Sequence, residues 1–258
     1  MPPQSSMPMD PSQASSRSRP SRGSHTRDRW RPSLAEGIDW DWIGRHGDDI
    51  ASATVGHLQL VGAGVGLAIA VGIPVAIAVR NRPISATIVS SSATVLYTIP
   101  SLALFAFLVP FFGIGKTPAI LGLAVYALGV LIRNTVTGLR GVAAPVLEAA
   151  RGMGLSRRQV LLRVELPLAV PAILTGVRLA TIETVAIATI AAFVAGGGLG
   201  ELILNDGIER ALFVTPIVAG TAIAIAMALT FDLLLVGLQR LATPWSRAGA
   251  ARPTGEPT

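Results

Sequence analysis

Long apolar stretches alternate with short charged ones along this chain. No charged residue occurs between Arg82 and Lys116, or between Arg210 and Asp232. Uninterrupted apolar runs of about 20 residues match the thickness of a bilayer's hydrocarbon core. The pattern predicts an all-α, polytopic membrane protein with about five transmembrane helices. The predicted spans are residues 58–79, 87–112, 117–139, 168–195 and 211–238.

The segments outside this membrane domain, residues 58–238, are polar. Residues 1–57 begin with a Ser-, Pro- and Arg-rich tail, a composition typical of disorder. The tail leads into a short amphipathic segment whose Trp40 and Trp42 are expected near the headgroups, with a plain linker as the alternative. Residues 140–167 form a basic loop between the third and fourth spans, and residues 239–258 form a second tail, predicted to be unstructured.

The first predicted span carries a helix-packing signal. Gly62 and Gly66 are four residues apart, so they lie on one face of a helix. Such a pair of small residues lets a neighbouring helix approach closely. We therefore expect this face to contact another helix.

Composition agrees with a membrane protein. Hydrophobic residues make up 51% of the chain and charged residues 14%, with a mean hydropathy of +0.58. An ordinary soluble domain has about a quarter of its residues charged. The net charge of +6 lies mainly in arginines beside the spans, where basic residues set orientation. No basic face with interleaved aromatics is visible, so we expect contact with membrane lipid and none with nucleic acid.

Cysteine and histidine content limits the metal sites and catalytic groups that the chain can form. The chain has no cysteine, which excludes disulfides and thiolate metal sites. His25, His46 and His57 all precede the first predicted span. We therefore expect neither an intramembrane metal site nor a Ser–His hydrolase, and the sequence indicates no catalytic residue.

The distribution of arginines predicts the orientation. With the 140–167 loop in the cytoplasm, five spans place the N-terminus outside and the C-terminus in the cytoplasm. The two outer connections then hold only Lys116 and Arg210 as basic residues, in agreement with the positive-inside rule. The arginine-rich N-terminal tail would be external, but only Arg45 lies close enough to a span to count strongly.

The sequence of the 140–167 loop predicts two short helices. Pro145 suits the first turn of a helix, and Gly152 and Gly154 permit a turn after it. Ser156 is a suitable cap for a second helix. The Leu166–Pro167 pair is expected to end that helix before the fourth span begins.

The spacing within this loop carries a family resemblance. The order is Glu-Ala-Ala, three residues, Gly, nine residues, an apolar residue, any residue, then Leu-Pro. The matching residues are Glu148, Ala149, Ala150, Gly154, Leu166 and Pro167. The pattern resembles the cytoplasmic EAA loop of the membrane subunits of binding-protein-dependent ABC importers. By that resemblance, these six residues contact an ATPase that is a separate chain.

Further strings resemble the glycine betaine/carnitine/choline, or osmoprotectant, branch of these importers. They are residues 98–104 with 112–116, residues 126–128 with 133–135, and residues 191–200. The resemblance covers about residues 55–240 and implies the five-helix core of the importer permeases. The function it implies is that of a plasma-membrane permease subunit for small quaternary-amine osmoprotectants.

The resemblance also implies partners. They are cytoplasmic ABC ATPase subunits, a second permease subunit that is identical or paralogous, and an extracytoplasmic substrate-binding protein. ATP and magnesium are expected on the ATPase, and no cofactor is expected on this chain. A phosphate-binding loop would need G-x-x-x-x-G-K-[ST], whereas the glycine cluster at 196–200 is followed by Glu201.

Other functions stay open. An importer of another small solute, such as an amino acid, shares parts of the same strings. An ion-coupled secondary transporter would use Glu183 or Asp232 as its ion site, but no inverted repeat is visible. A membrane enzyme such as an intramembrane protease is disfavoured by the absence of histidine from the predicted spans.

Three residues are candidates for a translocation path: Tyr97, Ser101 and Glu183. Pro100 interrupts helical hydrogen bonding, which a membrane tolerates where neighbouring helices or water satisfy the backbone. A kinked packing helix is the alternative. Glu183 is costly in lipid and is expected to face the path or a neighbouring subunit. Because the aromatic residues are scattered along the sequence, no aromatic cage for a quaternary ammonium ion is expected.

Two other charges fall within predicted spans. Arg178 and Glu183 are five residues apart on a helix and point in different directions, so we do not expect them to pair. Asp232 lies near the inner end of the fifth span and is expected to pair with Arg240 or with an arginine of a loop.

Overall fold

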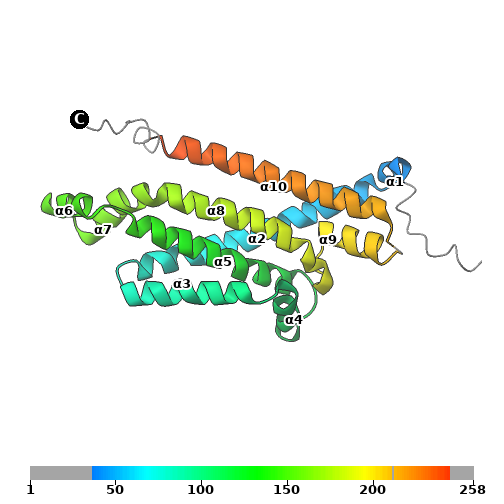
Figure 1. The fold of residues 1–258 in the computed structure, drawn as a ribbon, viewed down its shortest axis with the longest axis horizontal. Coiled ribbons are helices and arrows are strands. Elements are labelled where there is room, and N and C mark those ends of the chain that lie inside the picture. The colour runs from blue at the N-terminus through cyan, green and yellow to red at the C-terminus, as the bar shows by residue number, and fades with distance from the viewer. Residues whose placement is uncertain (1–36, 211, 245–258) are drawn as a thin grey trace, which may run out of the picture.

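The long helices of the protein run side by side along one axis (Figure 1). The computed structural model describes residues 37–210 and 212–244, and every regular element in this part is helical. Four helices there are long and apolar enough to cross a membrane. They are α2 (Gly47–Val79), α5 (Lys116–Arg140), the continuous helix Arg157–Ala188, and α10 (Val214–Ala242).

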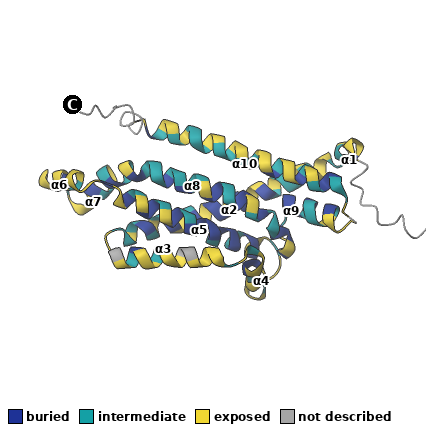
Figure 2. Ribbon diagram, in the orientation of Figure 1, coloured by how far each residue is buried: buried dark blue, intermediate teal, exposed yellow. Residues whose placement is uncertain are grey.

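Helix α5 forms the centre of the bundle, between α2 and α8, and most of its residues are buried (Figure 2). Glycines allow the close packing: a Cβ on Gly64 would lie 2.9 Å from the Cβ of Leu123, and one on Gly138 would lie 2.6 Å from the Cβ of Ala172. By contrast, most of α10 is exposed or half-buried (Figure 2). Its apolar side chains therefore face lipid or a neighbouring protein.

No helix of the described chain packs on the predicted small-residue face of the first span. No atom lies within 4 Å of a Cβ built on Gly62 or Gly66, and both glycines are exposed. The glycines that admit α5 are instead Gly64 and Gly72. The face bearing Gly62 and Gly66 is therefore directed away from the neighbouring helices of its own chain.

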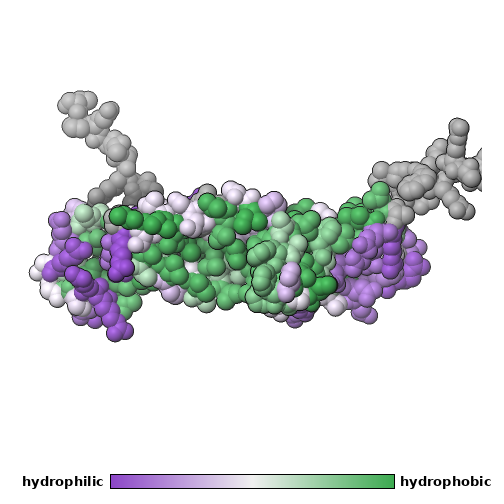
Figure 3. All heavy atoms as spheres, turned by 90° about the horizontal axis from the view of Figure 1, so that it is seen from below, coloured by the Kyte–Doolittle hydropathy of each residue, from purple (hydrophilic) through white to green (hydrophobic). Residues whose placement is uncertain are grey.

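The surface follows the pattern of a membrane protein. An apolar band occupies the middle of the molecule, and hydrophilic side chains gather at both ends of the long axis (Figure 3). One hydrophilic end holds the 140–167 loop and the other lies near α1 (Trp40–Arg45). An apolar band between two polar ends is the arrangement expected for helices that cross a bilayer.

The second predicted span, 87–112, is wrong as a single helix. The chain forms α3 (Pro83–Thr98) and α4 (Ser101–Phe112), and α4 lies across the direction of the long helices (Figure 1). The break falls at Ile99, whose ψ of 125° is extended, because the residue before a proline is disfavoured in helical conformation. The hydroxyl of Tyr126 donates a hydrogen bond to the Ile99 carbonyl and so satisfies a backbone group freed by the break.

The fourth membrane helix begins earlier than predicted, and Pro167 does not end a helix. The helix runs through α7 (Arg157–Val160), a π-helical turn η4 (Leu161–Glu165) and α8 (Leu166–Ala188) without interruption. Pro167 occupies the first turn of α8, directly after the wide turn. A π turn relieves the clash between a proline ring and the preceding turn, which explains why the helix continues.

After α8, the chain makes a compact return before α10. It passes through a 3₁₀ turn η5 (Ile190–Val194), α9 (Leu199–Glu201) and a π-helical turn η6 (Leu202–Ile208). The predicted fourth span, 168–195, therefore ends as an α-helix at Ala188, and α10 continues four residues beyond the predicted 238. Gly197 and Gly198 have φ of +88° and +80°, which allow the sharp turn into α9.

The N-terminal part of the described chain differs from the prediction in two ways. Trp42 is 7% exposed and packs edge-on against Phe213, so it lies inside the protein, whereas Trp40 is exposed. His57 lies within α2 and is fully buried, with Nε2 3.1 Å from the Val185 carbonyl oxygen. The prediction that all histidines precede the first membrane helix is therefore wrong for His57. The predicted unstructured tail at 239–258 is wrong for its first residues, because α10 continues to Ala242. Residues 1–36 and 245–258 lie outside the described residues.

Candidate functional site

The first helix of the 140–167 loop is α6 (Ala144–Gly152). Pro145 lies in its first turn, as predicted, where the missing N–H leaves no helical hydrogen bond unmade. Glu148 and Ala149 are exposed, whereas Ala150 is 2% exposed. The motif thus presents two residues to solvent and places a small third one against the rest of the loop.

A tight turn joins α6 to α7. Gly154 has a φ of +80°, a conformation that glycine adopts readily and other residues adopt only with strain. The N–H of Gly154 donates to the carbonyl of Arg151 at 2.9 Å. Ser156 then forms a capping box with Gln159, which confirms the predicted cap. The required glycine of the motif is therefore explained by backbone geometry.

The outer surface of the loop mixes apolar and basic side chains. Val146, Met153 and Leu162 are 42%, 75% and 51% exposed, although this end of the molecule is hydrophilic (Figure 3). Five arginines of the loop are also exposed: Arg140, Arg151, Arg157, Arg158 and Arg163. Exposed apolar groups rimmed by charge are typical of a docking surface for another protein.

An ion pair fixes this loop to the end of α2. Nε of Arg80 lies 2.6 Å from Oε2 of Glu165, and the two side chains are 15% and 8% exposed. Nη1 of Arg80 donates to the Ile77 carbonyl at 2.8 Å and so caps the last turn of α2. Nε of Arg140, at the end of α5, donates to the Arg80 carbonyl at 3.3 Å. The start of the fourth membrane helix and the ends of α2 and α5 therefore meet at one arginine.

Sequence reasoning missed this pair. A polar hollow of about 530 Å³ lies beside it, and Arg80, Arg151, Arg157 and Glu165 are among its lining residues. The available signal was an acidic residue set between Val164 and Leu166 in an otherwise basic loop. Leu166 and Pro167 are half-buried at this junction, away from the exposed Glu148 and Ala149.

The structure brings two of the three predicted path residues together. The Tyr97 hydroxyl, on α3, donates a hydrogen bond to Oε2 of Glu183, on α8. Both residues line a cavity of about 400 Å³ that α5 completes with Arg133 and Asn134. Ser101 is half-buried at the start of α4 and is not among the residues that line this cavity.

The aromatic residues are less scattered in space than along the sequence. The rings of Tyr97 and Tyr126 meet edge to face, with centroids 5.7 Å apart and an interplanar angle of 84°. The Tyr126 hydroxyl also donates a hydrogen bond to the Ile99 carbonyl. Tyr126 therefore fixes the end of α3, where Tyr97 lies. The expectation that the aromatics are dispersed is wrong for this pair.

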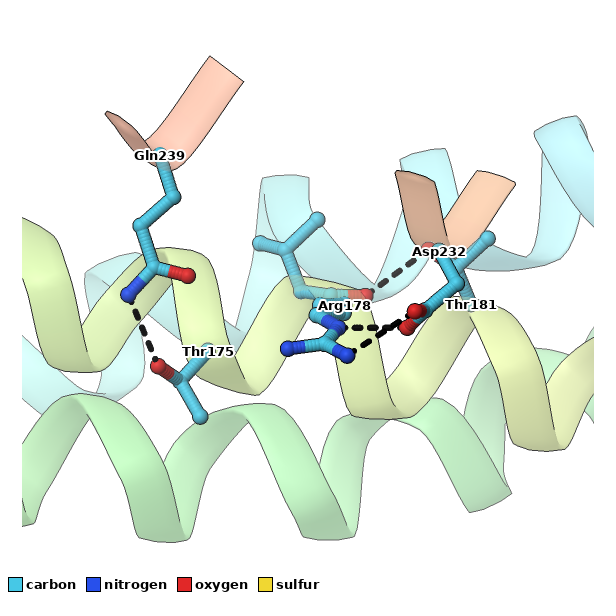
Figure 4. A network of polar contacts seen from close by, with 6 residues as sticks. Thr175, Arg178, Thr181, Asp232 and Gln239 are labelled. Carbon is cyan, nitrogen blue, oxygen red and sulfur yellow. Dashed lines mark hydrogen bonds and ion pairs between the residues drawn. The ribbon is translucent and has the colours of Figure 1, made fainter. Parts of the chain in front are cut away.

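A second set of polar contacts joins α8 to α10 (Figure 4). Arg178 and Asp232 form a bidentate pair, with Nε–Oδ1 at 2.5 Å and Nη2–Oδ2 at 2.9 Å. Asp232 was expected to pair with Arg240 or a loop arginine, and Arg178 takes that place. Gln239 adds a hydrogen bond to Thr175 at 3.3 Å. As predicted, Arg178 and Glu183 do not pair with each other, since each has a different partner.

Comparison with known proteins agrees with the helical membrane fold and with the motif of the 140–167 loop. Residues 68–247 match the family described as "Binding-protein-dependent transport system inner membrane component". The osmoprotectant import permease protein OsmW of Salmonella typhimurium is 40% identical over 200 residues, which cover 76% of this chain and 92% of that protein. The carnitine transport permease protein OpuCB of Listeria monocytogenes is 39% identical over 163 residues, covering 63% and 73%. The choline transport system permease protein OpuBB of Bacillus subtilis is 40% identical over 151 residues, covering 58% and 68%.

Solved structures share the fold. A chain of the MetNI methionine ABC transporter in an inward-facing conformation has a TM-score of 0.69 at 20% identity, with 75% of this chain and 96% of that chain covered. A chain of an amino acid ABC transporter has a TM-score of 0.67 at 20% identity, covering 79% and 98%. At this identity the likeness concerns the arrangement of helices and not the transported solute.

Proposed function

This chain belongs to the family of binding-protein-dependent transport system inner membrane components, and from that premise we propose that it is the membrane-spanning subunit of an ATP-driven importer for small quaternary-amine osmoprotectants. It is a multi-pass membrane protein of the plasma membrane. The substrate class is supported by relatives whose names specify osmoprotectant, carnitine and choline transport at 39–40% identity.

The observation that carries the proposal is the geometry of the 140–167 loop. Its two short helices project beyond the apolar band and are joined by the positive-φ turn at Gly154. The exposed Glu148 and Ala149 and the exposed apolar side chains suit insertion into a groove on a cytoplasmic ATPase. With α3 counted as a fifth crossing beside the four long helices, this assignment puts the loop and the C-terminus in the cytoplasm and the N-terminus outside.

Energy coupling then follows from rigid connections. ATP binding draws two ATPase subunits together, and each carries one loop with it. The loop is continuous with α8 through η4 and is bonded to α2 through the Arg80–Glu165 pair. Movement of the loop therefore moves two membrane helices, which opens or closes the path between paired permease subunits.

We assign ATP binding, substrate delivery and formation of the path to different subunits. ATP and magnesium are bound by the ATPase, since the glycine cluster of this chain lacks the Lys-Ser/Thr of a phosphate-binding loop. An extracytoplasmic binding protein delivers the substrate, and a second permease subunit completes the path. Tyr97 and Glu183 lie on that path at the 400 Å³ cavity, and Ser101 is assigned to its outer part, beside the helix break.

Reconstitution of the permease with its ATPase and binding protein in proteoliposomes tests the function. We expect uptake of labelled glycine betaine to require ATP on the side of the ATPase and to survive collapse of ion gradients. A catalytically inactive ATPase is the matched control. Uptake that persists without ATP but stops when the gradients collapse would identify an ion-coupled secondary transporter instead.

A further inference from the structure

The cavity between α3, α5 and α8 contains a carboxylate with an unusual environment. Within the described part of the chain, Glu183 accepts a hydrogen bond from Tyr97 but forms no ion pair with a basic side chain. The nearby Arg178 is committed to Asp232. A carboxylate within a membrane helix is costly unless a cationic group or water faces it. The environment of Glu183 therefore suits a cationic ligand.

The aromatic ring beside Glu183 has the matching property. Tyr97 lines the cavity and is 40% exposed, while Tyr126 packs against it and is 5% exposed. A quaternary ammonium has no N–H to donate, so it is recognised by the faces of aromatic rings and by carboxylates. Tyr97 supplies the ring, and Tyr126 acts as a positioning residue that holds it.

The opposite end of the same cavity is basic. Close contacts set the register of the antiparallel helices α5 and α8: a Cβ on Gly176 would lie 2.7 Å from the Cβ of Asn134. This register places Glu183 opposite Ala127, so Arg133 lies six residues, or about 9 Å, farther along the bundle. Arg133 and Asn134 both line the cavity. The Asn134 amide donates one N–H to the Val130 carbonyl at 2.9 Å and keeps a second, so both side chains can donate hydrogen bonds to an anion. The cavity therefore has a negative end and a positive end.

We propose that this cavity is a transient binding site for small zwitterions that carry a quaternary ammonium at one end and a carboxylate at the other. The ammonium lies against Tyr97 and Glu183, and the carboxylate faces Arg133 and Asn134. A volume of about 400 Å³ is in the range of small-ligand pockets. The site favours a betaine over choline, because choline has no carboxylate to offer the basic end. The inference rests on the proposed function and adds the residues and the polarity of recognition.

The absence of cysteine from the chain allows a direct binding test. Thr98 lines the cavity and is exposed, so Thr98→Cys should react with a soluble maleimide in the complete membrane assembly without binding protein. Glycine betaine should protect this cysteine at a concentration at least fivefold lower than choline does. Glu209→Cys, exposed in the connection between η6 and α10 and outside the cavity, is the control that should react with the maleimide and that neither ligand should protect.

Two charge variants assign the ends of the ligand. In the Thr98→Cys background, Glu183→Gln should raise the half-protecting concentration of both ligands about tenfold, as expected for the loss of about 1.4 kcal/mol. Arg133→Gln should raise it about tenfold for glycine betaine and less than twofold for choline. Arg210→Gln removes an exposed arginine outside the cavity and should change neither value.

The outcomes separate this inference from the proposed function. No labelling, no protection, or equal effects of Arg133→Gln on both ligands would overturn the zwitterion site, even if ATP-driven betaine uptake remains intact. Loss of ATP-driven uptake of every quaternary amine by the unmodified assembly would instead overturn the proposed function.

Discussion

Replacing Glu165 with glutamine removes the charge that faces Arg80 at the junction of the loop, α2 and α5. Removing one partner of a buried ion pair typically costs about 3–5 kcal/mol, because the other charge stays buried and unpaired. Arg80 is 15% exposed and borders the 530 Å³ polar hollow, so water reaches its guanidinium. We therefore expect a loss of about 2–3 kcal/mol in the free energy of unfolding, below the typical range.

A double-mutant cycle measures this interaction in the detergent-solubilised permease. Arg80→Gln combined with Glu165→Gln should cost less than the two single changes added together, with a coupling energy of about 1–2 kcal/mol. Arg163→Gln, an exposed change two residues from Glu165, should shift the free energy of unfolding by less than about 0.5 kcal/mol.

The same variant tests transmission of motion. In the assembled transporter, Glu165→Gln should raise the amount of ATP hydrolysed per substrate imported, because α2 no longer follows the loop as closely. Additive effects of the two single changes, together with unaltered coupling of ATP hydrolysis to uptake, would refute the role assigned to this pair.

Two pairs of glycine substitutions test backbone geometry in the purified permease. Gly154→Ala should lower the melting temperature, because alanine at a φ of +80° costs about 1 kcal/mol, whereas Gly152→Ala in the last turn of α6 should raise it slightly; equal shifts would contradict the assigned turn. Gly220→Ala should also lower the melting temperature, since its Cβ would lie 2.7 Å from Cγ1 of Ile203, whereas nothing lies within 4 Å of a Cβ on Gly237. Greater damage from Gly237→Ala than from Gly220→Ala would show that the return segment does not pack on α10 as described.

Local features of this protein were predictable because their causes lie close together in the sequence. The first turn at Pro145 and the cap at Ser156 each depend on a few neighbouring residues, and both are present. The break at Ile99 follows from the proline after it. The full separation of α3 from α4 was missed because it also depends on the Tyr126 hydroxyl, 27 positions away.

Features that depend on distant residues could not be read from the pattern. The Arg80–Glu165 pair joins positions 85 apart, and the Arg178–Asp232 pair joins positions 54 apart. Several arginines in the sequence could have paired with Glu165 or with Asp232. Only the packing of α2, α8 and α10 decides which arginine does.

The glycines of α2 show the same limit. Gly62, Gly64, Gly66 and Gly72 all lie on this helix, and spacing alone favoured the pair four residues apart. The helix rotation that places Gly64 and Gly72 against α5 is set by tertiary packing.

Site-specific cross-linking tests the central claim most directly, since a chain without cysteine accepts a single probe. Ala149→Cys, exposed on α6, should form a cross-link to the ATPase in the assembled transporter, and the yield should change when ATP is bound. Leu233→Cys, exposed on the apolar side of α10, should form none. Failure of Ala149→Cys to reach the ATPase, or its labelling by an impermeant reagent from outside the cell, would contradict the assignment of the 140–167 loop as the element that receives the motion of a separate motor.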